Sequence, residues 1–399
     1  SQIMAILASP MKASANMSKK RILTIIGARP QIIKAAALSR AIKTSFAEEL
    51  EEILVHTGQH YDENMSAVFF EELGIPKPNY NLAVGSGSHG KMTAAMLEGL
   101  EALMLAEKPA AVVVYGDTNS TIAGALAAAK IHVPVVHIEA GLRSFNKAMP
   151  EELNRISCDH MSTLLFVPTQ AGLDNLQKEG FSLENKGKAD IDNPHVYHCG
   201  DVMYDNSLYF SSVSEQKSDL LNKLGLIHQS FILCTIHRDT NTDHAIAINS
   251  IFSGLLQVQK ESGLNLVLPL HPRTRKKMEE LLDLKLKEEI ANNSLFQIID
   301  PVGFLDIIAL EENSKLIITD SGGLQKEAYF FKKPCVILRE QTEWIEIVDN
   351  GNALLAGTDT TLIVQHSAAL LAKKDFTYPP FYGDAHAAEA ICEIIIENL

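Results

Sequence analysis

Short apolar runs that alternate with helical segments constrain the fold of this chain more than any other feature of its sequence. Two of these runs, 110–115 and 133–138, flank a stretch of small residues, 118–130, that is predicted to be a helix. Strands that alternate with helices form parallel sheets with helices on both faces. The sequence predicts further strands at 21–26, 53–56, 164–167 and 196–199, and then at 231–236, 264–270, 295–299, 315–319, 335–338 and 353–355.

The strands fall into two arrays of similar size, which predicts an α/β protein with two doubly wound domains. A length of 399 residues is enough for both. We place the first domain at 19–204 and the second at 205–378. Residues 1–18 are interpreted as an extension or a remnant of cloning, and 379–399 contain a final helix.

Composition excludes several classes of protein. The net charge of -14 argues against binding to nucleic acid. No apolar run approaches the roughly 18 residues that a membrane-spanning helix needs. The five cysteines are scattered and form no C-x-x-C pair, which argues against a disulfide framework and fits a reducing, cytoplasmic location.

Carboxylates follow the two apolar runs named above. Asp117 and Glu139 come where each run ends, and Glu151-Glu152 begin a predicted helix shortly afterwards. Ligands of open α/β sheets bind beyond the carboxyl ends of the strands, so we expect these side chains to line a cleft. Burial and proximity would push their pKa values apart, as acid/base chemistry requires. A capping role for Asp117 and an ordinary first-turn position for Glu151 stay open.

A second cluster has the character of an anion site. Ser321-Gly322-Gly323 follow an apolar run and open a predicted helix, whose free N–H groups attract phosphate. Glu327, one turn further, is placed to accept hydrogen bonds from a ribose diol. The alternative is that Ser321 only caps the helix and Glu327 is a surface charge.

Cations follow the first strand of each array. Arg29 and Lys34 lie after one strand, and His237-Arg238 end the other. Solvated surface charge is the alternative for these residues. Taken together, the residues predict a cleft with carboxylates on one wall and a diphosphate seat on the other, which suits acid/base chemistry on a nucleotide sugar.

Several familiar motifs are absent. The sequence GSGSHG at 85–90 matches a dinucleotide fingerprint by letter, but no clear strand immediately precedes it, so a flexible turn is favoured over a Rossmann cofactor site. No metal-ligand spacing, Walker A motif or G-x-S-x-G occurs. We predict no metal and no cofactor.

These residues resemble the non-hydrolysing UDP-N-acetylglucosamine 2-epimerase family. The resemblance runs from about 21 to 399 and is carried by GARP, TGQH, YGDTNST, HIEAGLRS, MPEELNR, TIHR, PLHPRT, TDSGGLQKEA and REQTEW. It implies the GT-B fold, with the C-terminal helix returning to the first domain, and a cytoplasmic homodimer.

The resemblance also implies an activity. Family members interconvert UDP-N-acetylglucosamine and UDP-N-acetylmannosamine for surface polysaccharide synthesis, by eliminating UDP and adding it again to a 2-acetamidoglucal. By resemblance, proton transfer and orientation of the glucal belong to Asp117, Glu139 and Glu151, and His237 acts with them at the diphosphate. The implied substrate contacts are Arg29, Lys34, His60, Arg155, Arg238, Ser321, Gly322, Gly323, Glu327 and Arg339.

Two departures qualify the resemblance. Gln31 stands where many members have Glu. Tyr61-Asp62 stand where many bacterial members have a basic and amide pair that helps to bind a second, activating UDP-sugar, so that activation is not implied. GARPQ, TGQHYDENMS, GIPKP and GDVMYD are closer to the branch that epimerises UDP-2,3-diacetamido-2,3-dideoxy-glucuronate, which is the alternative function. A GT-B glycosyltransferase or an inactive UDP-sugar-binding protein is a more distant one.

Overall fold

Two parallel sheets form the core of the computed structural model, which describes residues 19–58, 70–71 and 74–399. The first sheet has the strand order β3-β2-β1-β4-β5-β6-β7, and every pairing in it is parallel. Its strands are β1 (Lys20–Ile26), β2 (Leu50–His56), β3 (Tyr80–Asn81), β4 (Ala111–Tyr115), β5 (Val135–Ile138), β6 (Leu164–Val167) and β7 (His195–His198).

The second sheet has the order β10-β9-β8-β11-β12-β13 and is also parallel. Its strands are β8 (Phe231–Thr235), β9 (Asn265–Pro269), β10 (Phe296–Ile299), β11 (Leu316–Thr319), β12 (Cys335–Ile337) and β13 (Ala353–Leu355). Strands covered on both faces read as continuous apolar runs, and β4 is buried throughout.

Helices connect the strands. None of them, among the described residues, combines the length and the apolar character needed to cross a bilayer. The predicted helix near 63–73 lies almost entirely outside the described residues. The helices of the first array are α1 (Arg29–Ser45), α3 (His89–Glu107), α4 (Asn119–Lys130), α5 (Pro150–Asp159), α6 (Gln170–Lys178) and α7 (Val202–Lys217). The remainder are α8 (Leu220–Lys223), α9 (Asp239–Thr242), α10 (Ala245–Ser262), α11 (Pro272–Leu281), α12 (Leu284–Ala291), α13 (Phe304–Asn313), α14 (Gly322–Phe330), α15 (Ile345–Asp349), α16 (Thr360–Ala372) and α17 (Ala387–Asn398).

Each sheet has one point where the strand order reverses, between β1 and β4 in the first and between β8 and β11 in the second. Ligands of doubly wound folds bind beyond the carboxyl ends of the strands at such points. The segments that follow these four strands carry Arg29, Asp117, His237 and Ser321. The topology therefore directs attention to one edge of each sheet.

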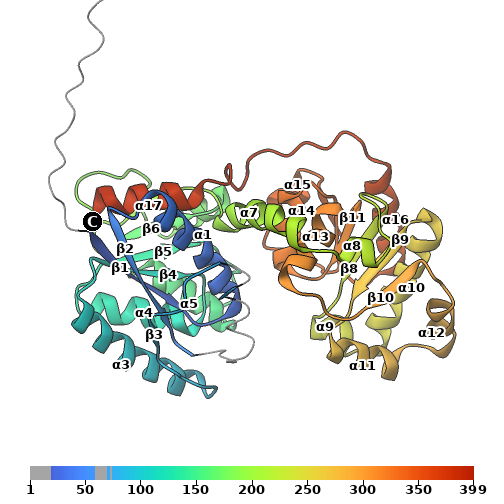
Figure 1. The fold of residues 1–399 in the computed structure, drawn as a ribbon, viewed down its shortest axis with the longest axis horizontal. Helices are drawn as coiled ribbons and strands as arrows, with labels where there is room; N and C mark the ends of the chain where they lie inside the picture. The colour runs from blue at the N-terminus through green and yellow to red at the C-terminus, as the bar shows by residue number, and fades with distance from the viewer. Residues whose placement is uncertain (1–18, 59–69, 72–73) are drawn as a thin grey trace, which may run out of the picture.

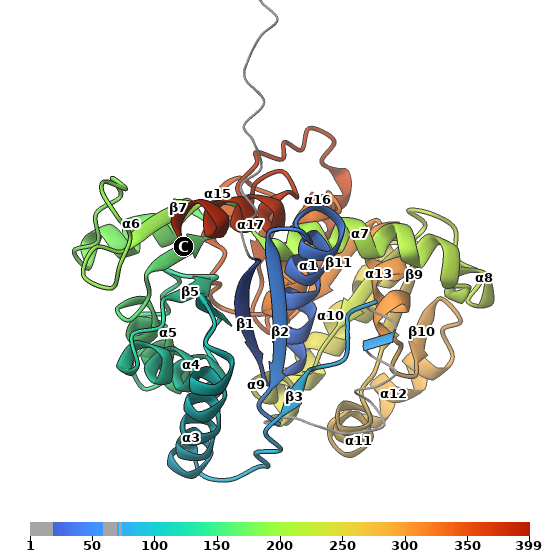
Figure 2. The same ribbon diagram turned by 60° about the vertical axis from the view of Figure 1, so that its left-hand side comes forward.

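One helix packs against both domains, and the final helix returns to the first. The helix α7 runs from the first domain toward the second (Figure 1) and packs against α1, α13 and α14. The final helix α17 lies beside α1 (Figure 1 and Figure 2), and Asp205 accepts hydrogen bonds from its first amides, Ala387 N and Ala388 N, at 3.2 and 2.8 Å. The predicted two-domain fold and the return of the last helix are confirmed. The boundary between 204 and 205 stays a prediction, since both residues lie within α7.

The loop at 85–88 leads into α3, where Ser88 caps the helix by accepting a hydrogen bond from Lys91 N. The preceding strand β3 is two residues long and ends at Asn81. GSGSHG is thus the entrance to a helix at the edge of the sheet and has no strand directly before it.

Candidate active site

Asp117 and Glu139 lie at the ends of neighbouring strands. β4 pairs with β5 so that Tyr115 faces Ile138, and each carboxylate follows within two residues. Asp117 Oδ2 is 2.6 Å from Nη2 of Arg155 on α5. The cap of α4 is Thr118, whose Oγ1 accepts from Thr121 N. The capping role considered for Asp117 therefore belongs to Thr118, and Asp117 is left to pair with Arg155.

Glu139 is held by Lys34. Lys34 Nζ lies 2.7 Å from Glu139 Oε1, and both side chains are mostly buried. Burial opposes ionisation of Glu139, but Lys34 and then Lys326 and Arg155 lower its pKa, so it is a carboxylate at neutral pH. Its backbone φ is +72°, a left-handed conformation that costs about 1 kcal/mol or more outside glycine. A strained residue that still carries a carboxylate is a candidate for a functional role.

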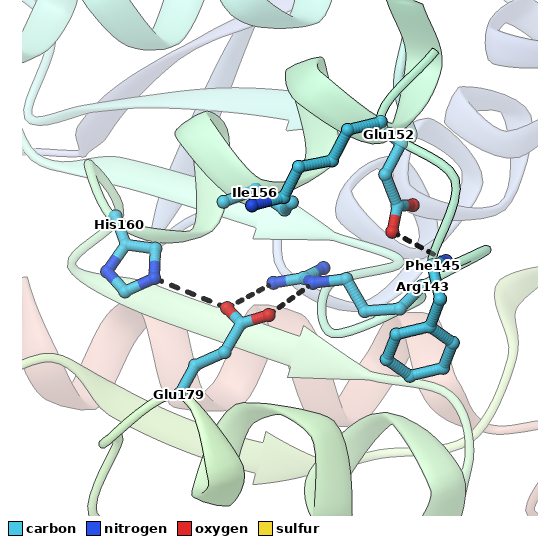
Figure 3. Close-up of a pocket in the computed structure, with 7 residues that line it drawn as sticks. Arg143, Phe145, Glu152, Ile156, His160 and Glu179 are labelled. Atoms are coloured by element: carbon cyan, nitrogen blue, oxygen red, sulfur yellow. Dashed lines mark hydrogen bonds and ion pairs between the residues drawn. The ribbon is translucent and has the colours of Figure 1, made fainter. Parts of the chain in front are cut away.

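The two glutamates after Pro150 differ in their surroundings. Glu151 is exposed. Glu152 is buried, and it accepts a hydrogen bond from Phe145 N at 2.9 Å (Figure 3). It also accepts from Ser144 N and from Arg155 Nη1, each at 2.9 Å. Arg155 therefore joins Glu152 to Asp117. Burial raises the pKa of Glu152, but the hydrogen bonds from the two amides and from Arg155 together lower it by more. The net shift is therefore downward.

Gln31, which stands where many members of the resembled family have Glu, makes a contact that needs an amide. Its buried side-chain oxygen accepts from Gly27 N and Ala28 N, and its Nε2 donates to the carbonyl of Tyr115 at 2.9 Å. Donation to a carbonyl requires an amide rather than a carboxylate. Gln31 thus ties the loop that precedes Arg29, which is exposed at the start of α1, to the end of β4.

The predicted anion seat is the start of α14. Ser321 Oγ caps the helix by accepting from Leu324 N. A side chain at Gly322 would bring its Cβ to 2.4 Å from Glu343 Oε1, so a larger residue there would displace the Glu343 carboxylate. Arg339 Nη2 is 2.9 Å from Glu343 Oε2, while its Nη1 is buried and has no hydrogen-bond partner among the described residues. The seat thus combines helix amides with one spare guanidinium donor.

Asp320, which the sequence analysis passed over, organises the residues opposite this helix. Its carboxylate is fully buried and accepts from the backbone amides of His237 and Arg238 at 3.1 and 2.9 Å. His237 Nδ1 lies 3.1 Å from Asp320 Oδ1, and the imidazole is half exposed. Asp320 therefore fixes the loop after β8 next to Ser321.

Glu327 lies beside a second acid, Glu311, on α13. Burial, followed by the neighbouring Glu327, raises the pKa of Glu311 well above its usual value, and burial is the main cause that raises the pKa of Glu327. Apart from Glu327, no described residue offers a hydrogen bond to either oxygen of Glu311. Two carboxyl groups in contact are compatible only when one of them holds a proton, so the pair shares one.

Lys326 is the second residue that sequence reasoning missed, although it lies within the SGG motif. Its ammonium is buried, 2.5 Å from Asp201 Oδ2 and 4.2 Å from the centre of the Trp344 ring. Asp201 also caps α7 by accepting from Met203 N. Burial lowers the pKa of Lys326, but Asp201 and then Glu139 outweigh it and raise that pKa. Lys326 thus joins α14 of the second domain to Asp201, which lies at the start of α7.

A cavity of about 570 Å³ lies behind the loop after β5 (Figure 3). Arg143 lines the cavity and donates to both oxygens of Glu179 at 2.7 and 2.8 Å, and His160 lies 3.3 Å from the same carboxylate. Glu152 lines the cavity and contacts Arg155 on its other side. Through Glu152 and Arg155, the cavity is therefore next to Asp117.

The structure brings Lys34, Glu139, Asp117 and Arg155 together in the first domain, and Ser321, Gly322, Arg339, His237 and Arg238 in the second. His60 lies outside the described residues. No group of three or more potential metal ligands occurs among the residues that are described.

Comparison with known proteins places the chain among enzymes of one kind. The profile of the family described as UDP-N-acetylglucosamine 2-epimerase matches residues 43–396. The chain is 49% identical to a UDP-2,3-diacetamido-2,3-dideoxy-D-glucuronate 2-epimerase of Pseudomonas aeruginosa, covering 94% of this chain and 99% of the relative. It is 40% identical to a UDP-N-acetylglucosamine 2-epimerase of Methanococcus maripaludis, covering 94% and 98%. The crystal structure of the Methanocaldococcus jannaschii UDP-GlcNAc 2-epimerase in complex with UDP-GlcNAc and UDP is similar, with a TM-score of 0.78, 36% identity and coverage of 94% and 99%.

Proposed function

The chain belongs to the UDP-N-acetylglucosamine 2-epimerase family and is an isomerase, and we propose that it inverts C2 of a UDP-2-acetamido sugar without hydrolysing it. The observation that carries the proposal is the pairing of Asp117 with Arg155 and of Glu139 with Lys34 at adjacent strand ends. The family resemblance drawn from the sequence is confirmed.

The chemistry requires two opposite proton transfers. A carboxylate removes the C2 proton while the bond from C1 to the UDP oxygen breaks, which gives a 2-acetamidoglucal and UDP. UDP oxygen then attacks C1, and a carboxyl group delivers a proton to C2 from the other face. Inversion therefore needs an acid/base group on each face of the sugar, and Asp117 and Glu139 are our assignment, with Glu151 nearby to orient the glucal.

The leaving UDP needs positive charge that is already in place. We assign this role to the α14 amides at Ser321, Gly322 and Gly323 and to Arg29, His237, Arg238 and Arg339. Arg339 Nη1 supports the assignment, because it lies next to Gly322 and no described residue accepts a hydrogen bond from it. Glu327, with Glu311 behind it, is our candidate for the ribose hydroxyls; Lys34, Arg155 and His60 complete the proposed substrate contacts.

Two sugar nucleotides are candidate substrates. UDP-N-acetylglucosamine, interconverted with UDP-N-acetylmannosamine, follows from the family, and UDP-2,3-diacetamido-2,3-dideoxy-glucuronate is favoured by the 49% identity to the Pseudomonas relative. An NMR time course with each sugar nucleotide, side by side in D2O, decides between them. We expect one of them to give the C2 epimer with deuterium at C2.

The same experiment tests the reaction class. Epimer without deuterium would refute elimination and re-addition. Transfer of the sugar to an added acceptor would indicate a glycosyltransferase, and UDP binding without turnover of either sugar would indicate a binding protein. Either result would overturn the proposed function.

We also propose a cytoplasmic homodimer, with products that supply surface polysaccharide synthesis. All five cysteines are free, which suits a reducing compartment. Sedimentation analysis of the purified chain measures the dimer directly, and a monomer at working concentrations would contradict it.

A further inference from the structure

His137 is a fully buried histidine that the reaction described above does not use. It lies on β5, and neither it nor its partner Asp159 has any exposed surface. Its Nδ1 is 2.6 Å from Asp159 Oδ1, and its Nε2 is 2.8 Å from the carbonyl oxygen of Gly116. Both ring nitrogens thus face acceptors. Only the imidazolium, which carries a proton on each nitrogen, donates to both.

The surroundings of the ring balance this charge. Asp159 Oδ2 lies 2.8 Å from Arg143 Nη2 and accepts from Gly141 N at 3.1 Å. Arg143 in turn pairs with Glu179, which His160 also contacts (Figure 3). Two cationic side chains, His137 and Arg143, therefore alternate with two carboxylates, and the buried charges are compensated.

The titratable and charged groups packed on the ring are Asp159 and Cys158 from α5, with Arg143 behind Asp159. Burial alone would lower the pKa of His137, but Cys158 and Asp159 raise it well above the usual value. In the same way burial opposes ionisation of Asp159, while His137 and Arg143 lower its pKa. Geometry and charge therefore agree on an imidazolium–carboxylate pair at neutral pH.

The contact points of this pair flank the proposed acid/base groups. Gly116 directly precedes Asp117, and Gly141 follows Glu139 by two residues. Gly116 has φ +64°, and the peptide after a glycine rotates at little cost because no Cβ restricts it. The hydrogen bond from Nε2 holds that carbonyl in one direction, while Asp159 holds the amide of Gly141.

We propose that His137 and Asp159 are positioning residues: the buried pair fixes the Gly116 carbonyl and the Gly141 amide, and through them the separation of Asp117 and Glu139. This inference rests on the proposed epimerase function for its catalytic consequence. The protonation state of His137 does not depend on that function and is measured separately.

The first experiment is a nitrogen NMR spectrum of the intact enzyme with 15N-labelled histidine. His137 is assigned by the signal that disappears in His137→Gln. At about pH 8 an ordinary histidine with a pKa near 6.5 is neutral, whereas we expect His137 to show two protonated nitrogens. A neutral His137 at this pH would overturn the proposal, whatever reaction the enzyme proves to catalyse.

The second experiment uses two matched amide variants. The nitrogen of Gln reaches the place of Nε2, so His137→Gln keeps the donor to Gly116. The nitrogen of Asn reaches the place of Nδ1, so His137→Asn keeps the donor to Asp159. A purely structural role predicts that His137→Asn, which keeps the charge-assisted bond, is the more stable and the more active variant.

We expect the opposite order of activity. His137→Gln should keep a kcat about tenfold or more above that of His137→Asn, since small misplacements of reacting groups cost that much. KM and UDP affinity should be the same in both, because the anion seat lies in the other domain. Equal kcat values, or kcat that follows thermal stability, would refute the positioning role. If neither variant folds, His137 is assigned in the wild-type enzyme by through-bond correlation of its ring nitrogens with its own backbone, and the NMR measurement decides.

Discussion

Lys34 Nζ lies 2.7 Å from Glu139 Oε1, although 105 residues separate the two in the chain. The pair joins the helix after β1 to the end of β5 across the intervening strand β4. It keeps Glu139 ionised in a largely buried place, where removal of the cation should change both the pKa of Glu139 and the stability of the fold.

Lys34→Gln should therefore raise the pKa of Glu139 and move the acidic limb of the pH–rate profile toward higher pH. Because the native pKa of Glu139 is lowered, the pair stabilises the fold above the unfolded pKa of about 4.3 and loses this effect as pH falls through the native value. In Lys34→Gln, the free energy of unfolding should not show this decrease as pH falls. Lys43→Gln, an exposed lysine on the same helix, is the control. An unshifted acidic limb would show that Lys34 does not tune Glu139.

Asp117→Asn should abolish turnover while UDP binding survives. Removal of a positioned acid/base group costs about 10²- to 10⁴-fold in kcat, and the anion seat at α14 is independent of β4. Calorimetry with UDP and the D2O time course measure the two properties separately. Asp375→Asn, at an exposed site far along the chain, should leave both unchanged. An Asp117→Asn enzyme with wild-type kcat would remove Asp117 from the mechanism.

Lys326→Met should destabilise the enzyme by about 3 kcal/mol or more, since it leaves Asp201 buried and unpaired. Adding Asp201→Asn to this variant should recover part of the loss, because Asn removes the charge and still caps α7. Urea unfolding measures both variants, with Lys374→Met, at an exposed position, as the control. Additive effects of the two substitutions would contradict a direct pairing.

Glu311→Gln should stabilise the protein increasingly as pH rises. The native pKa of Glu311 is raised, so its contribution to stability is complete below the unfolded pKa of about 4.3 and declines as pH rises through the native value. A glutamine needs no proton to lie against Glu327. Thermal melts at several values between about pH 5 and 8 measure the effect. Glu312→Gln, its neighbour in sequence, is the control, and parallel melting curves for wild type and Glu311→Gln would exclude a shared proton.

Much of the candidate site was predictable because strand ends are visible in the sequence. Asp117, Glu139, His237 and Ser321 each follow an apolar run within two residues, and parallel strands all end at the same edge of their sheet. Their grouping follows from local pattern and topology alone. The helix-forming stretch after Ser321 likewise predicted an N-terminus directed to that edge.

The partners of these residues were not predictable. Asp320, Lys326 and Asp159 stand beside or near known motifs, yet a sequence pattern does not reveal which charge meets which. The role of Asp320 could have been predicted, because this acid stands between a predicted strand and the SGG motif. The role of Lys326 could not, because its partner Asp201 is 125 residues away.

The sequence by itself therefore determined the alternation of strands and helices, the two domains and the sheet edge at which the candidate site lies, because these depend on apolar periodicity over short distances. The tertiary structure alone decided the pairs Lys34–Glu139, His137–Asp159, Glu311–Glu327 and Lys326–Asp201. Those pairs depend on strand order and on how helices from both domains pack, and burial there converts ordinary charges into groups with shifted pKa values.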